Sequence, residues 1–460
     1  MSHPSLVIQG TAFHTPIWGV LEVLENCAIA INASGIIENV LLPGEDAHEA
    51  LITAAANRQT LHQLDQDEFL IPGLVDLHIH APQWPQLGKA LDAPLEIWLE
   101  EYTFPLEARY SDHVFAREVY DDLVQTLLSQ GTTTAVYFGS VDLHANVILA
   151  QACLRYGQRA LVGKVAMDNP EQCPDYYRDE SAASALRDTK KFIASVQNLQ
   201  AENSKLVLPA ITPRFIPSCT DDLLHGLGQL ATETGCHIQT HCSESDWEVA
   251  YVRDRLNKSD TEALADYGLL TDKTILAHSN FVNTTDLKLM AKKGAAVAHC
   301  ALSNAYFANA VFPARQAHDY GVSVGLGTDI SGGFSSSLFD GIRYTIMASR
   351  HASSGTSPVV CADDRGNPDA PLTTVETFHM ATAQGGEALR LPIGLFKSGY
   401  AFDALSIRSN TPNSAFNIRK EADSLIDVFE KLVLTADKTC ISEIWVDGAD
   451  SIKRQNTAQS

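Results

Sequence analysis

The chain has 460 residues, 45% of them hydrophobic, and its 33 basic and 56 acidic residues give a formal charge of −23. This composition suits a globular enzyme with a large core, and the negative charge disfavours binding to a nucleic acid polymer or an anionic membrane. The nine cysteines are scattered without CxxC spacing, and no apolar run reaches the ~18 residues of a membrane span. We therefore expect a cytoplasmic protein without a disulfide framework.

Short β-prone segments occur near both ends of the chain, at residues 6–14, 27–31, 36–41, 404–408 and 441–446. An Ala33-Ser34-Gly35 turn separates two of the first three. We expect both ends to fold together as a small β-sandwich domain. Its two parts would be residues 1–70 and 396–460, and a larger domain would occupy residues 71–395 between them.

The middle of the chain alternates between β-prone runs and helix-patterned segments. The runs are 72–80, 132–138, 160–168, 206–215, 237–241, 274–278, 295–299 and 322–329. The helical segments are 116–129, 146–156, 182–197, 221–233, 285–292 and 314–320. Eight strands in alternation with helices predict an α/β fold, a (β/α)8 TIM-like barrel whose active site lies at the carboxyl ends of the strands. Residues 353–372, rich in Ser, Gly, Pro and Asp, are expected to form a surface loop.

The first run ends in His78-Ile79-His80. Alternate residues on a strand point to the same face, so both imidazoles can reach one metal ion. Taken alone, the pair is as compatible with polar residues of a surface or a core as with a metal site.

Three further candidate ligands end later runs: His241 the fifth, His278 the sixth and Asp329 the eighth. A single strand-end histidine is often a hydrogen-bonded structural residue, and a strand-end aspartate is often a cap. All five groups share the carboxyl edge of the expected barrel, however. This common position favours a catalytic metal site.

Three imidazoles and a carboxylate suit Zn²⁺, which keeps a position for water in catalytic sites, although iron accepts the same set. A second ion would need a bridging group from the fourth run, which offers none. Lys164 on the third run is the nearest candidate, and we expect it to be buried and paired. The sequence therefore predicts one ion per chain.

Glu244 lies three residues after His241, just past a strand end. Zinc lowers the pKa of bound water to ~7, and a carboxyl at this position could carry a proton from that water to a substrate. The alternative is a glutamate in the first turn of a helix, where it would stabilise the amino end.

Motifs around these residues occur in the order found in the guanine deaminases, in the mononuclear deaminase branch of the amidohydrolase superfamily. They are PGLVDLHIHAPQ (72–83), YTFP (102–105), GTTT (131–134), VGKV (162–165), ITPRF (211–215), HCSE (241–244), AHC (298–300) and GLGTDISGG (325–333). Over roughly residues 65–410 the chain resembles this family, and the match is thinner at both ends.

The resemblance implies hydrolytic removal of the 2-amino group of guanine in purine catabolism, with xanthine and ammonia as products. It also implies a homodimer and one bound Zn²⁺. The metal ligands carried over by position are His78, His80, His241 and Asp329.

The same resemblance implies three catalytic residues. His278 would orient or deprotonate the attacking water, Glu244 would protonate the ring nitrogen next to C2, and Asp329 would also accept a proton. The substrate-binding residues would be His80, Gln83, Arg214, Phe215, Glu244 and Asp329. From pattern alone, a surface ion pair is the better explanation of Arg214, and a core aromatic is the better explanation of Phe215.

The sequence departs from the family pattern at two places. Pro82 and Trp84 flank Gln83, which suggests an altered pocket rim, and residues 301–304 read Ala-Leu-Ser-Asn, which puts the contacts of this loop in doubt. Two other functions stay open. One is a deaminase or hydrolase of another heterocycle, such as 8-oxoguanine, an adenosine-type substrate or an s-triazine. The other is a noncatalytic scaffold with this fold, which would be expected to lack some ligands.

Overall fold

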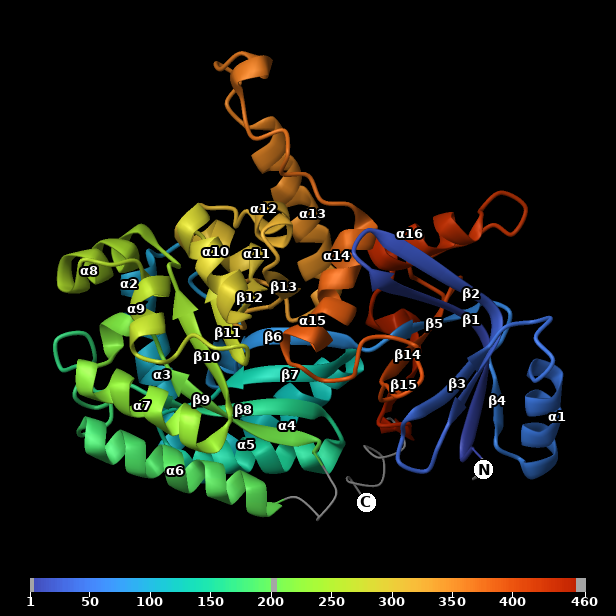
Figure 1. Ribbon diagram of the computed structural model, residues 1–460, viewed down its shortest axis with the longest axis horizontal. Coiled ribbons are helices and arrows are strands. Elements are labelled where there is room, and N and C mark those ends of the chain that lie inside the picture. Colours follow the sequence, from blue (N-terminus) through green and yellow to red (C-terminus); the bar gives the residue numbers. More distant parts are fainter. Residues whose placement is uncertain (1–3, 200–204, 452–460) are drawn as a thin grey trace.

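The computed structural model describes residues 4–199 and 205–451, which form a barrel at one end of the molecule and a second eight-stranded sheet at the other (Figure 1). The barrel strands are β6 (Leu74–His80), β7 (Thr132–Phe138), β8 (Arg159–Ala166), β9 (Val207–Pro213), β10 (His237–Cys242), β11 (Thr274–His278), β12 (Ala296–His299) and β13 (Ser323–Leu326). They follow one another in chain order and every neighbouring pair is parallel. The predicted eight-stranded barrel is confirmed.

The barrel closes between its last and first strands through backbone hydrogen bonds just beyond β13. The N–H of Asp329 donates to the carbonyl of His78 at 2.9 Å, and the N–H of His80 donates to the carbonyl of Ile330 at 2.9 Å. The eighth strand is therefore shorter than the predicted 322–329. Asp329 has a φ of 50°, which takes the chain out of strand geometry where it delivers this side chain.

All six predicted helices are present, with bounds that differ by a few residues. They are α4 (His113–Ser129), α5 (Leu143–Tyr156), α6 (Ala182–Leu199), α7 (Asp221–Thr234), α10 (Thr284–Lys293) and α12 (Ala314–Asp319). Local sequence sets their ends. Thr220 and Asn283 cap the first turns of α7 and α10 with side-chain oxygens, and left-handed Gly235 and Gly294 end the same two helices.

Further helices lie in the connections. They are α2 (Leu95–Trp98), α3 (Phe104–Ala108), α8 (Asp246–Leu256), α9 (Asp260–Asp266), α11 (Ala301–Ser303), α13 (Leu338–Ser354), α14 (Thr374–Ala381) and α15 (Ala383–Ala388). The short helices α2 and α3 belong to the long β6–β7 connection, which contributes side chains to the cavity described below.

The small domain is built from both ends of the chain, as predicted. Its strands are β1 (Leu6–Ile17), β2 (Val20–Ile31), β3 (Ile37–Leu41), β4 (Leu61–Gln63), β5 (Glu68–Pro72), β14 (Ala404–Arg408), β15 (Ile441–Val446) and β16 (Ala449–Asp450). They form one hydrogen-bonded sheet in which carboxyl-terminal β14 pairs antiparallel with amino-terminal β5. Two helices accompany it, α1 (His48–Arg58) and α16 (Leu425–Thr435). The sandwich arrangement and the limits at residues 70 and 395 stay predictions.

A buried ion pair ties the barrel to the small domain. Arg159, the first residue of β8, donates from Nε and Nη2 to the two carboxylate oxygens of Asp403, at 2.9 and 3.1 Å. Burial by itself would lower the pKa of Arg159, but the charge and hydrogen bonds of Asp403 raise it above its usual range. The pair is therefore a structural, bidentate contact at the end of the barrel opposite the strand-end residues.

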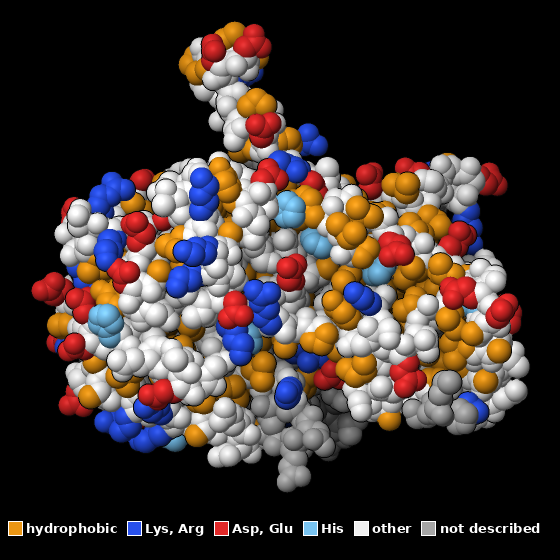
Figure 2. Space-filling view, viewed as in Figure 1, with side chains coloured by type: hydrophobic (Ala, Val, Ile, Leu, Met, Phe, Trp, Pro, Cys, Tyr) orange, Lys and Arg blue, Asp and Glu red, His pale blue; other side chains and the backbone are white. Residues whose placement is uncertain are grey.

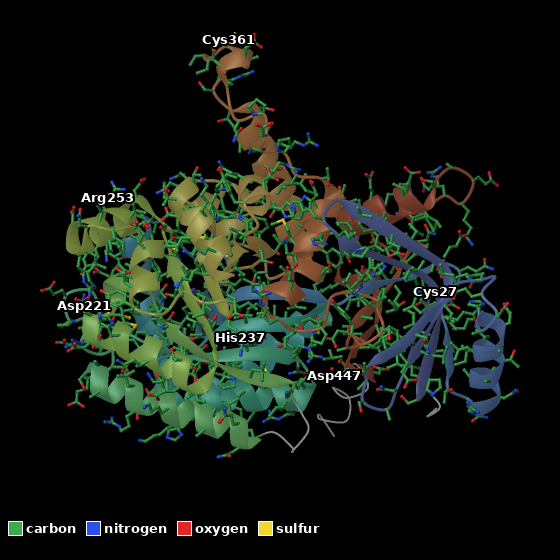
Figure 3. The ribbon with its side chains drawn as sticks, viewed as in Figure 1. Cys27, Asp221, His237, Arg253, Cys361 and Asp447 are labelled. Carbon is green, nitrogen blue, oxygen red and sulfur yellow. The ribbon has the colours of Figure 1, made fainter. Side chains whose placement is uncertain are left out.

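The segment after β13 projects from the body of the molecule as a narrow arm made of α13 and the chain that follows it (Figures 1 and 2). Its tip is exposed, with 91% of Val359 accessible to solvent and Cys361 at the far end (Figure 3). The predicted surface loop at 353–372 is therefore confirmed, apart from the end of α13 and a short turn at Ala362–Asp364.

The nine cysteines all lie in the described ranges, and all are free. This confirms the absence of a disulfide framework. Among the described residues we find no helix that has both the length and the apolar character needed to cross a membrane. Acidic and basic side chains are interspersed on the face shown in Figure 2.

Candidate active site

The first two candidate ligands lie on β6, where every residue is buried. His78 and His80 alternate along the strand and project from the same face, with their ring centroids 4.9 Å apart. Their Nε2 atoms lie 3.2 and 3.6 Å from the same carboxylate oxygen, Oδ1 of Asp329. In the structure, the two imidazoles of this His-x-His pair, which was ambiguous in the sequence, therefore lie beside the same carboxylate.

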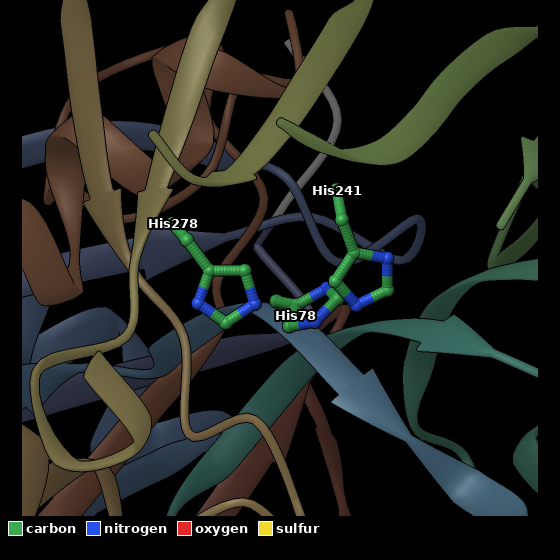
Figure 4. A group of neighbouring side chains, drawn as sticks. All are labelled: His78, His241 and His278. Carbon is green, nitrogen blue, oxygen red and sulfur yellow. The ribbon is translucent and has the colours of Figure 1, made fainter. Parts of the chain in front are cut away.

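His241 and His278 reach the same point from β10 and β11 (Figure 4). The Nδ1 of His241 lies 2.7 Å from the carbonyl oxygen of Arg214, and the Nδ1 of His278 lies 2.9 Å from Oδ1 of Asn304. Both partners are acceptors, so each Nδ1 carries the proton and each Nε2 keeps its lone pair. Both lone pairs belong to the buried cluster that includes His78.

The separations among these donor atoms fit one metal ion. Ligands bound at ~2.1 Å with angles of 90–110° lie ~3.0–3.5 Å from each other. The Nε2 atoms of His80 and His241 are 3.0 Å apart, and those of His78 and His278 have no hydrogen-bond partner among the described residues. Burial, helped by neighbouring positive groups, holds the pKa of His78, His80 and His241 well below its usual value. Neutral imidazoles are the form that binds metal.

Asp329 has a strained backbone conformation, which a second buried carboxyl helps to maintain. Its left-handed backbone is uncommon for a residue other than glycine and costs energy that the surroundings must supply. Asp76, on β6, accepts from the backbone N–H of Thr328 at 3.0 Å and from its hydroxyl at 2.6 Å. Burial raises the pKa of Asp76 to about 7, against the opposing effect of these hydrogen bonds. Asp76 thus fixes the turn that presents Asp329.

Lys164 is buried and paired, as expected. Its Nζ donates to Oδ1 of Asp179 at 2.8 Å and to the carbonyl of Val165 at 3.0 Å. Two of its three N–H groups are therefore taken by the Asp179 carboxylate and the Val165 carbonyl. Nothing in the described part of the chain suggests that this lysine bridges two ions.

Glu244 lies beside the cluster, with Oε1 3.6 Å from Nε2 of His278. It precedes Ser245, the N-cap of α8, so it is not a first-turn helix residue. Burial, and next the charge of Asp329, raise the pKa of Glu244 to about 8, while Arg214 opposes the shift. A carboxyl with this pKa can hold and release a proton near neutral pH.

A cavity opens next to these groups. It is lined by His80, Gln83, Leu95, Trp98, Leu99, Arg214, Phe215, His241, Glu244, Phe307, Asp329 and Gly332. Arg214 is 3% exposed, so it is not a surface ion pair, and Phe215 contacts His241 edge to face with centroids 6.3 Å apart. Gln83, Arg214 and Phe215 are thus brought to the same cavity as the histidine cluster.

Sequence reasoning missed the other wall of this cavity. Trp98 and Phe307 pack with their rings 5.0 Å apart, and Leu95 and Leu99 lie beside them. No signal in the sequence pointed to these apolar residues. Trp84 was expected at the rim, but its Nε1 donates to Asp122 on α4 at 2.6 Å and it is absent from the lining residues.

Asn304 was also missed as a functional residue, although the atypical 301–304 segment drew attention to it. Its Oδ1 accepts from His278 and, at 3.2 Å, from Nδ2 of Asn280. The same Asn280 amide donates to the carbonyl of Glu244 at 2.9 Å. The loop whose contacts were in doubt therefore orients His278 and is linked to Glu244.

The chain is similar to several known proteins. A model of the amidohydrolase family matches residues 69–448. A probable guanine deaminase of Schizosaccharomyces pombe is 36% identical over 97% of this chain and 83% of its own length. A guanine deaminase of Homo sapiens is 34% identical over 96% and 95%. A crystal structure of guanine deaminase from C. acetobutylicum, with guanine bound in its active site, superposes with a TM-score of 0.85 at 30% identity and covers 97% of this chain and 99% of its own.

Proposed function

The chain belongs to the amidohydrolase family, and we propose that within it the protein is a metal-dependent guanine deaminase that hydrolyses guanine to xanthine and ammonia in purine catabolism. One observation carries the proposal. A single cavity is lined by three of the four possible metal ligands, His80, His241 and Asp329, and the fourth, His78, lies within ligand distance of them. The same cavity is lined by the proton-carrying carboxyl of Glu244 and by three side chains suited to a purine, Gln83, Arg214 and Phe215. Relatives named guanine deaminase match nearly the whole chain, which supports this substrate.

The proposed metal site holds one ion, with His78, His80, His241 and Asp329 as ligands. The donor set suits Zn²⁺, and iron would also be accepted. When bound, the ion supplies Lewis-acid activation of the attacking water. The pairing of Lys164 with Asp179 supports one ion rather than two.

Three residues would move the protons. Asp329 and His278 would take the proton that leaves the attacking water, and their positions 3.8 Å apart let either serve. Glu244 would give its proton to the ring nitrogen next to C2. It would then take up the proton that His278 or Asp329 accepted from the water, and pass this second proton to the departing amine. Its pKa of about 8 supports a role as an acid at neutral pH.

The substrate-binding groups would act on different parts of the base. Arg214 would donate to the 6-oxo group, and Gln83 would donate and accept along the purine edge. Phe215 would pack against the ring, while His80, Glu244 and Asp329 would contact the reacting end. Trp98 and Phe307, across the cavity, would exclude water from it.

The direct test is an ultraviolet assay that follows guanine loss and xanthine formation by the metal-loaded protein. We expect turnover of guanine, with far lower kcat/KM for 8-oxoguanine, adenosine and s-triazines. If kcat/KM is higher for one of those compounds than for guanine, that compound, and not guanine, would be the preferred substrate. A metal-loaded protein that turns over none of them would indicate the noncatalytic scaffold.

We also propose a cytoplasmic homodimer. The free cysteines suit a reducing compartment. The projecting arm carries exposed Val359 and Val360 at its tip, 91% and 40% accessible, which a second copy of the chain could cover. Sedimentation equilibrium should therefore give twice the mass of one chain.

A further inference from the structure

A buried carboxylate that sequence reasoning did not single out lies behind the substrate-binding side chains. Glu107, on α3, is 1% exposed. It accepts from Nη1 and Nη2 of Arg214 at 2.6 and 3.2 Å, and from Nε2 of Gln83 at 2.9 Å. One carboxylate therefore holds both of the polar side chains that would read the purine edge.

The same short helix holds the arginine from a second direction. Phe104 lies three residues before Glu107, so both side chains project from one face of α3. The guanidinium carbon of Arg214 lies 5.0 Å from the centre of the Phe104 ring, within the range of a cation–π contact. The aromatic ring covers one face of the guanidinium, while the carboxylate accepts two hydrogen bonds from the edge of the guanidinium. This contact places Phe104, from the YTFP motif of residues 102–105, against the arginine that would bind the substrate.

These contacts determine which hydrogen-bonding groups remain for a ligand. Arg214 has five N–H groups and gives two of them to Glu107. Gln83 gives one N–H to Glu107, and its Oε1 accepts from the backbone N–H of Ser331 at 3.2 Å. The amide of Gln83 is therefore fixed against rotation and cannot exchange its donor and acceptor ends.

The ion pair also sets the charge of this wall of the cavity. An unpaired buried guanidinium would attract an anion strongly, because the interior screens charge poorly. Paired with Glu107, Arg214 contributes no net charge while it still donates hydrogen bonds. Such a wall suits a neutral base. Deamination replaces the amino group of guanine with a second carbonyl, which makes the N–H groups of the product more acidic than those of the substrate.

We propose that Glu107 is a positioning residue that orients Arg214 and Gln83 toward neutral guanine and keeps the cavity from retaining the anionic form of the product, with Phe104 fixing the guanidinium from its face. This inference rests on the proposed function, so guanine turnover by the wild-type holoenzyme must be established first. If that turnover is absent, the function fails, whereas the role of Glu107 fails only through the comparisons below.

The main test compares wild-type holoenzyme with Glu107→Gln, which keeps the shape of the side chain and removes its charge. We expect KM for guanine to rise about tenfold or more and kcat to stay within about threefold of wild type. The reason is that Glu107 orients groups that bind substrate and takes no part in the chemical step. Xanthine binding would be measured by calorimetry between pH 6 and 9. As xanthine ionises, we expect its affinity for the variant to increase relative to its affinity for wild type. The ratio of guanine KM to xanthine Kd should then rise at high pH by about tenfold over wild type.

Two further variants separate charge from geometry and from general damage. Glu107→Asp keeps the negative charge but moves it one methylene away from Arg214 and Gln83. KM for guanine should therefore rise, while discrimination against the xanthine anion should stay as in wild type. Asp403→Asn breaks a second buried, bidentate arginine pair, formed with Arg159 at the amino end of β8, and should leave both quantities unchanged.

The outcomes are decisive in either direction. Glu107→Gln with wild-type KM and a wild-type pH dependence of xanthine binding would overturn the proposal. So would an Asp403→Asn variant that reproduces the changes of Glu107→Gln, because the effect would then come from the loss of any buried ion pair. If Glu107→Gln does not fold, Glu107→Asp alone decides, and an unchanged KM in that variant would overturn the role in positioning.

Discussion

Replacing Glu244 with glutamine should separate proton transfer from metal binding. The fold should survive, because the backbone of Glu244 is held independently of its side chain: its N–H donates to Oε2 of Glu248 at 2.7 Å and its carbonyl accepts from Asn280 at 2.9 Å. Glutamine keeps the shape but cannot exchange a proton. We expect kcat to fall ~10²–10⁴-fold, the usual range for general acid–base catalysis, which corresponds to ~2.7–5.4 kcal/mol of barrier. Metal content and KM should stay close to wild type.

The same substitution should stabilise the metal-free protein. The pKa of Glu244 is raised from 4.5 to about 8 in the folded state, so the group destabilises the fold above pH 4.5, and the penalty grows until pH 8. At pH 7 the folded carboxyl is largely protonated while the unfolded one is ionised. That difference costs on the order of 3 kcal/mol, which glutamine avoids. The metal-free variant should therefore unfold at a higher temperature than metal-free wild type at pH 7, and the gap should narrow at pH 5.

Three measurements check this reasoning: guanine turnover in the ultraviolet, elemental analysis of the purified protein, and thermal unfolding in a chelator at both pH values. Loss of metal from the variant would make Glu244 a ligand. An unchanged kcat would move the acid to another residue. A metal-free variant less stable than wild type at pH 7 would refute the claim that burial raises the pKa of this carboxyl.

Other perturbations probe the ligands, the substrate contacts and the barrel core. His241→Ala should abolish metal binding and activity together, and elemental analysis that found one ion in an active variant would contradict its role as a ligand. Arg214→Ala should lower kcat/KM for guanine at least ~tenfold, and unchanged efficiency would leave Arg214 only a structural ion pair. Burial lowers the pKa of His299 from 6.5 to about 4, so its contribution to stability is complete above pH 6.5 and is lost as pH falls toward 4. When the pH is lowered from 7.5 to 5, the free energy of unfolding measured in urea should therefore fall by ~2 kcal/mol less in His299→Gln than in wild type. An equal fall in both proteins would show that His299 is not buried as a neutral group.

The sequence by itself was enough to predict the barrel and most of the residues that meet at the carboxyl ends of its strands. Backbone geometry makes alternate residues of a strand share a face, so the imidazoles of His78 and His80 were expected to point in the same direction. Parallel strands bring their carboxyl ends to one edge, so His241, His278 and Asp329 were expected near that pair although they lie far along the chain. Helix ends were also local, because caps and left-handed glycines act within one turn.

Strand-end position alone did not decide which residues meet. His299 ends β12 much as His278 ends β11, yet only His278 joins the cluster of possible ligands found among the described residues. The difference depends on which way each side chain turns after its strand. Asn304 and the left-handed backbone of His278 determine that turn, and neither can be read from strand periodicity.

Only the tertiary structure decided the partners of Gln83 and Arg214, the groups proposed to bind the substrate. Glu107 meets Arg214 across 107 residues of sequence, because the long β6–β7 connection folds α3 over the end of β9. Trp98 comes to the cavity from the same connection. Strand and helix patterns follow from repeating local geometry, whereas a connection without a repeat places its side chains according to everything it packs against. That is why the cluster of possible metal ligands was predictable from the sequence, while the carboxylate that holds Arg214 and Gln83 was not.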